Sequence, residues 1–310
     1  GNNNSMLALQ HLVFSRSNIG MFFINRQSTG DPDFLAEENR YNRVAGIDYN
    51  LISADNVWSG QYYLHKSFSP GVEGRDWSAG ASMRYNSRNY SGSTKWVYIG
   101  ENFDSDLGFV RRTDIVKGLA SFNRAFWPED SFINTHSFGV TPVFIWRPTQ
   151  DYQNTDYSIF SQWEARFRNR ERLQLQWSNR YTYLFDSFDP TGSEDGLELP
   201  ADTEYHYNSF QVEYQSDARR ILAYGVETTV GDFYNGERFS VEGNLALRIQ
   251  PKAFISMQLN YDKITLPDPY PSADIWLIAP RFELTFSKSL FLSTLVQYSN
   301  QRDNFGVNAR

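Results

Sequence analysis

The sequence predicts an all-β protein, an antiparallel transmembrane β-barrel of the outer-membrane type, on three observations. Apolar and polar residues alternate along most of the 310 residues, the alternating stretches are long, and short and long connections take turns between them. The stretch FSVEGNLALRIQPKAFISMQLNYD, residues 239–262, shows the alternation on both sides of Pro251. A period of two predicts two strands and a tight turn, because successive side chains of a strand point to opposite faces.

Sixteen alternating stretches follow one another along the chain. Each is near or above the roughly 9–11 residues that a tilted strand needs to cross a bilayer, whereas strands in soluble proteins average about five or six. This length favours a membrane barrel over its rivals, a soluble β-sandwich or a propeller with its shorter strands. The stretches are 5–14, 18–27, 41–52, 57–68, 76–89, 92–103, 113–127, 132–147, 154–168, 171–186, 203–216, 219–231, 237–250, 253–264, 274–287 and 290–302, and 304–310 begins a partial strand.

Connections between the stretches alternate in length. Short turns lie at 15–18, 53–56, 128–131, 169–172, 217–220 and 251–253, and longer loops lie at 28–40, 69–75, 104–112, 148–153, 187–202 and 265–273. Outer-membrane barrels have short periplasmic turns and longer external loops, so 189–202 and 266–274 are predicted at the cell surface. The first stretch then descends from outside, and we expect a single barrel domain over 1–310 that is incomplete at both ends, from a parent of about 18–20 strands.

Composition is compatible with a barrel and excludes some function classes. The net charge of -7 argues against a nucleic-acid partner, which would need a basic surface, and the absence of cysteine excludes disulfides. Aromatic residues make up 16% of the chain, and tryptophans recur near the ends of the stretches, as expected for rings at a membrane interface. We therefore expect the apolar face of the strands to contact outer-membrane lipid.

The opposite, polar parity carries many charges. A charge at the bilayer midplane costs about 2–4 kcal/mol, so this parity is predicted to face a polar lumen. Mixed signs predict cross-strand ion pairs that brace the inside, and a pore whose charges select the solute is the alternative. The candidate lumen charges are Arg84, Arg124, Glu164, Arg166, Arg180, Glu227, Glu242, Arg248, Arg281 and Glu283.

One segment breaks the alternation: GENFDSDLGFVRRTD, residues 100–114. It resembles the "ENFNPE-GFV-R" passage of the outer-membrane barrel family called domain of unknown function 5916, with Asp104-Ser105-Asp106 in place of Asn-Pro-Glu. RSNIGMFFINRQ (16–27), YNRVAGIDYNL (41–51), WSAGASMRYNSRNYSGS (77–93) and NFGVNAR (304–310) fit the same resemblance. The resemblance implies a barrel in Gram-negative bacteria, notably Bacteroidota, usually behind a domain like family-nine carbohydrate-binding modules. It brings no catalytic residues.

The segment 100–114 is also the candidate plug of the lumen. Asp104 and Asp106 are expected to pair with Arg111 and Arg112, Gly108 permits a tight bend, and Phe109 is the expected anchor in the lumen or on the rim. A ligand-binding or gating loop and a self-satisfied loop folded over the barrel mouth are the two interpretations. The candidate residues are Glu101, Asp104, Asp106, Gly108, Phe109, Arg111 and Arg112.

Catalytic and metal chemistry have little support in the sequence. The four histidines lie on separate strands outside any metal-binding spacing, and His206 with Glu204 or Asp202 is the only pairing that suggests a barrel-embedded hydrolase. The acidic loop with Asp189, Glu194, Asp195, Glu198 and Asp202 has oxygen ligands for Ca²⁺, but it lacks the EF-hand spacing, which favours a solvated, highly charged loop. We expect no enzymatic activity, no catalytic residue, no metal and no cofactor.

The leading functional hypothesis is an outer-membrane protein of a Gram-negative bacterium with an occluded polar lumen, which captures or passes a surface ligand. A glycan is one candidate ligand, on the family resemblance alone. The alternative is a structural or assembly subunit that serves other outer-membrane or surface proteins as a platform. The expected partners are thus outer-membrane lipid, such proteins and a glycan, and no nucleic acid.

Overall fold

A computed structural model describes residues 1–29, 36–193, 196–302 and 304–310. It contains one antiparallel sheet of seventeen strands and, among these residues, no α-helix. The all-β antiparallel prediction is confirmed, as are the sixteen long stretches with a further short strand after them. The strands are β1 Asn2–Val13, β2 Ser17–Ser28, β3 Tyr41–Ile52, β4 Trp58–Phe68, β5 Trp77–Asn86, β6 Tyr90–Ile99, β7 Ile115–Phe126, β8 Ile133–Arg147, β9 Gln153–Phe167, β10 Arg172–Leu184, β11 Thr203–Gln215, β12 Leu222–Phe233, β13 Gly236–Ile249, β14 Ala253–Thr265, β15 Ala273–Thr285, β16 Phe291–Ser299 and β17 Asn304–Ala309.

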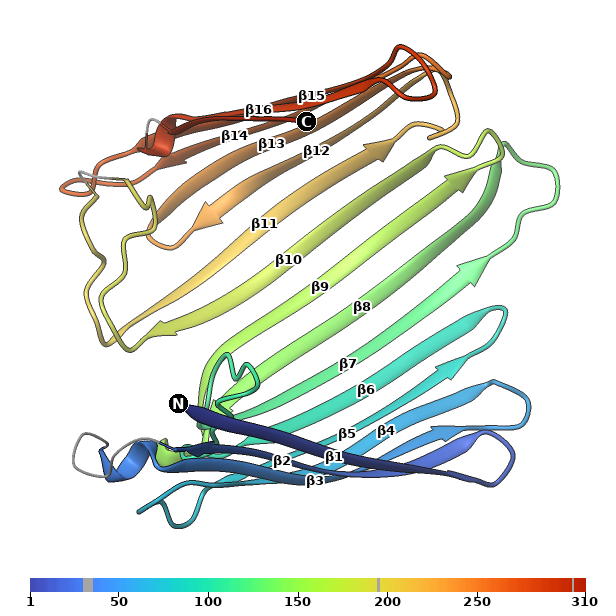
Figure 1. Cartoon of the computed structure of the whole chain (residues 1–310). Helices are drawn as coiled ribbons and strands as arrows, with labels where there is room; N and C mark the ends of the chain where they lie inside the picture. The colour runs from blue at the N-terminus through green and yellow to red at the C-terminus, as the bar shows by residue number, and fades with distance from the viewer. Residues whose placement is uncertain (30–35, 194–195, 303) are drawn as a thin grey trace. The chain divides into compact units, whose positions relative to one another are not determined.

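The chain divides into two compact units. Unit 1 comprises Gly1–Arg124 and Thr141–Tyr157, and unit 2 comprises Ala125–Val140 and Ser158–Arg310. In unit 1 each strand from β1 to β7 pairs with the next, and in unit 2 the same holds from β10 to β17 (Figure 1). Three of the short turns contain a residue with a positive φ value, which reverses the chain direction: Phe14, Asn56 and Arg170. Consecutive pairing makes each unit a meander of hairpins.

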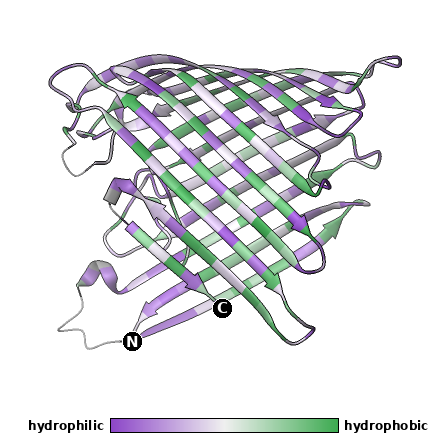
Figure 2. Cartoon of the chain, turned by 90° about the horizontal axis from the view of Figure 1, so that it is seen from above, coloured by the Kyte–Doolittle hydropathy of each residue, from purple (hydrophilic) through white to green (hydrophobic). Residues whose placement is uncertain are grey.

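Each strand of unit 2 has an apolar and a polar face. The ladders place Trp177, Phe210, Val230 and Phe239 in one row across β10–β13, and all four side chains are exposed. The neighbouring positions of the same strands carry Gln, Ser, Glu, Thr and Arg residues, so colours alternate along each strand in Figure 2. We call these two sides the apolar face and the polar face.

Unit 1 repeats this arrangement. Leu9, Met21, Ile47 and Leu64 lie opposite one another across β1–β4 on the apolar face, and all four are exposed. Trp58, Trp77 and Trp96 are exposed on the apolar faces of β4–β6. The large apolar side chains of these rows are therefore exposed rather than packed in a buried core.

Glycines and rings on adjacent strands interlock instead. A Cβ at Gly46 would collide with the rings of Phe22 and His65, and one at Gly80 would collide with Tyr63. On the apolar face, a Cβ at Gly118 would lie 2.7 Å from the indole of Trp96 on the adjacent strand. Each ring thus occupies space that only glycine leaves open.

Most connections alternate in length, as predicted, but the long loop expected at 148–153 is wrong: β8 and β9 are joined by 148–152, a short connection that contains the 3-10 helix Pro148–Gln150. Chain segments 14–16, 53–57, 87–89, 168–171 and 250–252 are short, whereas 69–76, 100–114 and 185–202 are long. The connection between β12 and β13 departs from the alternation, because Tyr234, with a φ of 51°, and Asn235 close it alone. Among the described residues, no helix is long and apolar enough to cross a membrane.

Candidate functional site

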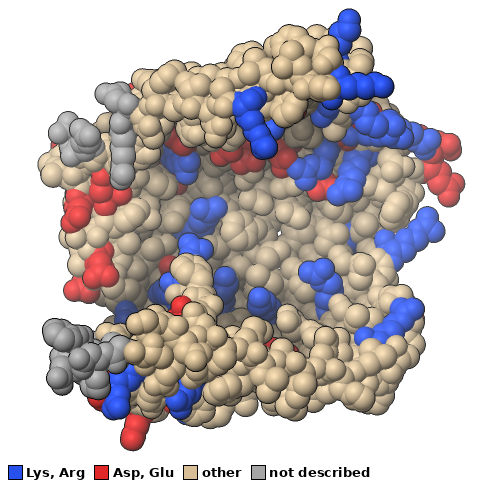
Figure 3. Space-filling model, in the orientation of Figure 1, with Lys and Arg blue, Asp and Glu red and all other residues tan. Residues whose placement is uncertain are grey.

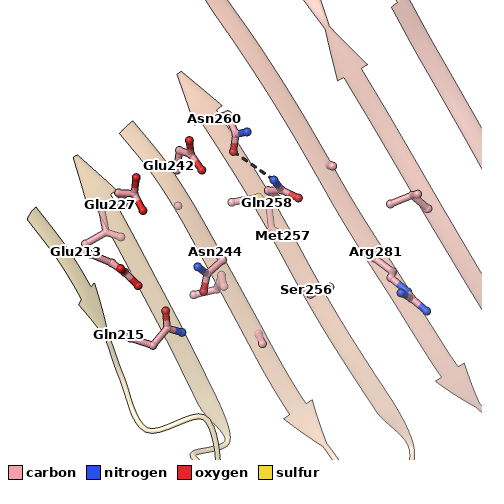
Figure 4. Close-up of a pocket in the computed structure, with 16 residues that line it drawn as sticks. Glu213, Gln215, Glu227, Glu242, Asn244, Ser256, Met257, Gln258, Asn260 and Arg281 are labelled. Atoms are coloured by element: carbon pink, nitrogen blue, oxygen red, sulfur yellow. Dashed lines mark hydrogen bonds between the residues drawn. The ribbon is translucent and has the colours of Figure 1, made fainter. Parts of the chain in front are cut away.

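The polar face of unit 2 forms a shallow hollow of about 500 Å³, floored by β11–β15. Glu213, Glu227 and Glu242 face one another in register on the adjacent strands β11, β12 and β13, and their side chains lie side by side in Figure 4. Carboxamides surround this carboxylate row, and Arg281 lies at the far side of the hollow. The hollow therefore offers many hydrogen-bonding groups, beside apolar side chains such as Met257 and Leu295. The carboxamides are Gln215, Asn244, Gln258 and Asn260.

Arg172 is the main basic partner beside the carboxylate row. Its guanidinium pairs with Glu213 on β11 and, at 3.4 Å, with Glu164 on β9, so one cation joins two carboxylates of different strands. Arg166 pairs with Glu164 at 2.6 Å along the same strand. The expected cross-strand bracing is present here, although its central residue, Arg172, was not among the candidates.

Like charges meet where opposite charges were expected. Among the described residues, no Lys or Arg lies within ion-pair distance of Glu227 or Glu242, which face each other directly. Arg281 pairs with Glu283 of its own strand rather than across strands. Figure 3 shows acidic groups gathered beside basic ones on this side of the strands at the top of the view. Alternation predicts which face a charged residue occupies. It does not predict the strand register, which determines which charges lie opposite one another.

Nine of the ten candidate lumen charges lie on the polar face, and one does not. Arg84 lies opposite Ser59 and Ser93, and Arg180 lies opposite Tyr207, as expected for polar-face positions. The remaining seven are Glu164, Arg166, Glu227, Glu242, Arg248, Arg281 and Glu283.

Arg124 was placed on the polar face wrongly. It lies opposite Tyr90 on the parity of Phe122, and its guanidinium sits 5.6 Å from the centroid of the Tyr90 ring. Its position near the end of β7 explains how a charge is tolerated there, because a long basic side chain can reach past the apolar zone.

The loop 100–114 between β6 and β7 folds onto the polar side of unit 1 (Figure 1). Asn42 of β3 donates to the Asp104 carbonyl at 3.3 Å and accepts from the Asp106 amide at 3.0 Å. Ser67 of β4 accepts from the Asp104 amide at 3.2 Å, and Arg26 of β2 donates to the Asp106 carboxylate at 2.7 Å. Three successive strands therefore hold the first half of the loop.

These contacts correct the expected pairing within the loop. Asp106 pairs with Arg26, and Arg112 pairs with Asp156 at 2.8 Å and not with Asp104 or Asp106. Glu101 pairs with Arg75 at 2.9 Å. The loop is thus fastened to its surroundings rather than to itself, because the surrounding strand ends offer better-placed partners than its own arginines.

Phe103, not Phe109, is the buried aromatic of the loop. Phe103 is 8% exposed, whereas Phe109 is 89% exposed, so the prediction of Phe109 as the anchor is wrong. Gly108 closes the expected turn by donating its N–H to the Ser105 carbonyl at 3.0 Å. Arg111 is exposed. The sequence analysis also missed Asn42 and Ser67 as partners of the loop. In the sequence they look like any other polar residue of an alternating strand, so nothing distinguishes them as loop contacts.

Asp114 ends the loop in a buried, fully satisfied position. Its carboxylate accepts from Arg147 at 2.9 Å, from the Thr149 amide at 3.1 Å and from the Thr149 hydroxyl. Burial alone would raise the pKa of this carboxyl, but the hydrogen bonds from Thr149 and Arg147 outweigh burial and hold the pKa below its usual value. Asp114 is therefore a carboxylate at neutral pH that ties the start of β7 to the end of β8.

The candidate hydrolase residues lie at the start of β11, and both carboxylates accept hydrogen bonds from tyrosines. Glu204 accepts from Tyr181 at 3.1 Å, and Asp202 accepts from Tyr183 at 3.2 Å. His206 lies 4.6 Å from Tyr181, ring to ring. Asp189 organises its own turn by accepting from the Thr191 amide at 2.8 Å, whereas Glu194 and Asp195 lie outside the described residues. No group of three metal-ligating side chains occurs among the residues that the structure describes.

A pair that sequence reasoning treated as unrelated is His65 and Asp48. The β3–β4 register brings them together on the polar face of unit 1, with Nε2 and Oδ1 3.2 Å apart. In this register Asp48 lies opposite Tyr63 and His65 opposite Gly46, so the two residues meet diagonally across the strands.

No curated protein matches the chain. The family model described as a domain of unknown function, DUF5916, matches residues 23–294 and so covers both units and the loop 100–114. The ENF and GFV residues of this loop are thus part of a match over most of the sequence, and the chain belongs to the DUF5916 family.

Proposed function

We propose that the chain is an outer-membrane β-barrel protein, in which the sheet closes, the apolar face contacts lipid and the polar face lines the lumen. The observation that carries the proposal is that exposed apolar side chains lie in rows across β10–β13 and across β1–β4, with charged residues on the reverse face. A water-exposed apolar surface of this extent favours aggregation, whereas in lipid it is the stable arrangement.

Strand length and edge chemistry support closure of the sheet. Most strands have 10 to 15 residues, for example β5 and β9, which suits a tilted crossing of the hydrocarbon layer. Backbone groups at an open edge would be unsatisfied in lipid, and only a closed barrel satisfies them. Localisation in the outer membrane of a Gram-negative bacterium follows from this proposal.

Within such a barrel, we propose capture or passage of a polar surface ligand past a narrowed lumen. A barrel of this strand number would otherwise hold a wide aqueous channel. The loop 100–114, fastened to β2, β3 and β4, is the narrowing element. The carboxylates, the carboxamides and Arg281 of the unit 2 hollow provide hydrogen-bonding groups for a hydroxyl-rich ligand such as a glycan. This function is non-enzymatic.

The same loop favours a second candidate function, a closed barrel that serves as a platform for other outer-membrane or surface proteins. Phe109 is exposed at the loop, and an exposed ring is a suitable contact for a partner. In this case the polar face braces the barrel and passes no solute.

Refolding and conductance test both candidates. The full chain should fold in detergent micelles, insert into planar bilayers, and resist unfolding in sodium dodecyl sulfate until heated. Deletion of 104–110 should raise conductance, while the matched deletion of 267–271, in the loop between β14 and β15, should not. Folding as a monomer in buffer without detergent overturns the barrel. Equal conductance of an open wild type and the 104–110 deletion overturns the plug, and absence of conductance in both favours the platform.

A further inference from the structure

A second hollow, of about 460 Å³, lies on the polar face of unit 1 over β1–β4. The ladders align Gln10, Gly20 and Asp48 across β1, β2 and β3, with Ala8 and Phe22 in the adjacent row. We call the space above Gly20, between Gln10 and Asp48, the Gly20 notch. It depends only on the pairing of these strands, and so does not rest on closure of the sheet or on the proposed function.

Open space at Gly20 distinguishes it from the other glycines of this face. The nearest atoms to a Cβ at Gly20 would be the Leu9 carbonyl oxygen at 3.7 Å and the Asp48 Cβ at 4.0 Å. At Gly46 and Gly80, by contrast, rings of neighbouring strands already fill the space. The Gly20 notch is therefore unfilled by the protein and able to accept a group from outside.

The wall of the notch carries one carboxylate without a strong cationic partner. Asp48 is paired with His65 alone, and among the described residues no Lys or Arg lies within ion-pair distance of it. Its side chain is 28% exposed, so an incoming group can reach it. Because a partly desolvated carboxylate gains most from a cation with N–H donors, the charge of the notch selects for such a group.

One part of the lining is apolar or aromatic, although Asn18, Asn50 and Gln61 also line the hollow. Phe22 lies in the row next to Gly20, its ring fixed edge-on against His65 at 4.9 Å. Met6 is 70% exposed and lines the same hollow with Ala8 and Ile24. An alkyl group can pack on these side chains, and an aromatic ring attracts a nearby cation.

We propose that the Gly20 notch binds a small organic cation, a primary alkylammonium group or its guanidinium counterpart. The cationic head donates to the Asp48 carboxylate, and the alkyl body lies against Phe22 and Met6. An anion of the same shape is repelled by Asp48, and a neutral analogue lacks the charge-assisted hydrogen bond. The occupant is thus defined by positive charge joined to an apolar body.

Calorimetric titration of the folded full chain in detergent micelles tests this assignment, with butylammonium as the probe and butanol and butyrate as matched comparisons. Butylammonium should bind, and butanol and butyrate should bind at least about tenfold more weakly. Asp48→Asn keeps the shape of the side chain and should weaken butylammonium binding by about ten- to a hundredfold, the range for hydrogen bonds to a charged group. Gly20→Leu keeps Asp48 but fills the notch, and should abolish binding.

Glu283→Gln is the control, because it removes a carboxylate of the polar face far along the sequence, where Arg281 already neutralises it. It should leave the butylammonium affinity unchanged, and circular dichroism should show the same β-sheet signal for all variants compared. The proposal is overturned if butylammonium does not bind the wild type, or if Asp48→Asn binds it equally well. It is also overturned if sodium at equal concentration displaces butylammonium, since the notch would then recognise charge alone.

Discussion

Leu245 lies on the apolar face of β13, and its replacement by arginine tests which medium that face contacts. The side chain is 40% exposed and lies in register between Tyr224 of β12 and Met257 of β14. Asn244, the preceding residue, lies opposite Gln258 on the polar face. The two positions differ by one residue and by the face they occupy.

The expected cost follows from depth in the bilayer. Strands rise about 3.4 Å per residue, so Ile249, the last residue of β13, lies about 14 Å further along the strand than Leu245. At a strand tilt of about 40°, the two side chains differ in depth by about 10 Å, which is most of the distance from the midplane to the edge of an apolar band about 25 Å tall. Leu245→Arg should cost about 2–4 kcal/mol and Ile249→Arg about 0–1 kcal/mol.

Reversible urea unfolding in lipid vesicles measures both values, with Asn244→Arg as the matched control. Asn244→Arg should change the free energy of unfolding by less than about 0.5 kcal/mol, because its polar face admits water. Equal costs for Leu245→Arg and Ile249→Arg would contradict a depth-dependent environment and indicate that the apolar face packs against protein. A cost for Asn244→Arg above that for Leu245→Arg would mean that the two faces are assigned the wrong way round.

Three further outcomes are expected. Asp114→Asn should lower the free energy of unfolding by about 1–3 kcal/mol at pH 7, because it replaces a buried, hydrogen-bonded carboxylate. The pKa of Asp114 is lowered on folding, so the carboxylate stabilises the fold fully above its unfolded pKa of about 4, and this stabilisation is lost as the pH falls below that value. In urea titrations, the stability of the variant should therefore fall less in acid than that of the wild type. Arg26→Ala should speed trypsin cleavage after Arg111 and Arg112, because it removes the ion pair with Asp106 that holds the loop. Arg40→Ala is the control: it removes an exposed pair with Glu37 and should leave the cleavage rate unchanged. Equal cleavage rates for the two variants would show that the Arg26–Asp106 pair does not hold the loop. Glu227→Gln should raise the free energy of unfolding by about 0.2–1 kcal/mol by relieving repulsion within the carboxylate row, an effect that added salt should reduce, and a destabilised variant would count against repulsion there.

Alternation was enough to predict the strands and the face of most residues. The period of two assigns Glu242 and Arg248 to one side and Leu245 to the other without any knowledge of the fold, because strand geometry alone imposes that division. Arg124 escaped this reasoning since it lies near the end of β7, where a long side chain tolerates the apolar parity.

Partners across strands were harder to predict. Neighbours depend on the register, which the turns determine, and an error of one residue exchanges the faces. The carboxylate row and the His65–Asp48 pair both arise from register. The contacts of Asn42 and Ser67 with the loop 100–114 depend further on how a loop folds, and no periodic pattern describes that.

The glycine–ring contacts have a consequence for how this sheet avoids misalignment. A shift of one residue exchanges the apolar and polar faces and is penalised for that reason, but a shift of two residues keeps the faces and escapes this penalty. If β4 slipped by two residues along β3, each side chain would keep its face, yet the ring of His65 would leave the space over Gly46 and meet a neighbour with a Cβ. The interlocked rings therefore favour the native strand register over a register shifted by two residues. A larger residue at Gly46 or Gly118 is expected to covary with a smaller side chain at its ring partner.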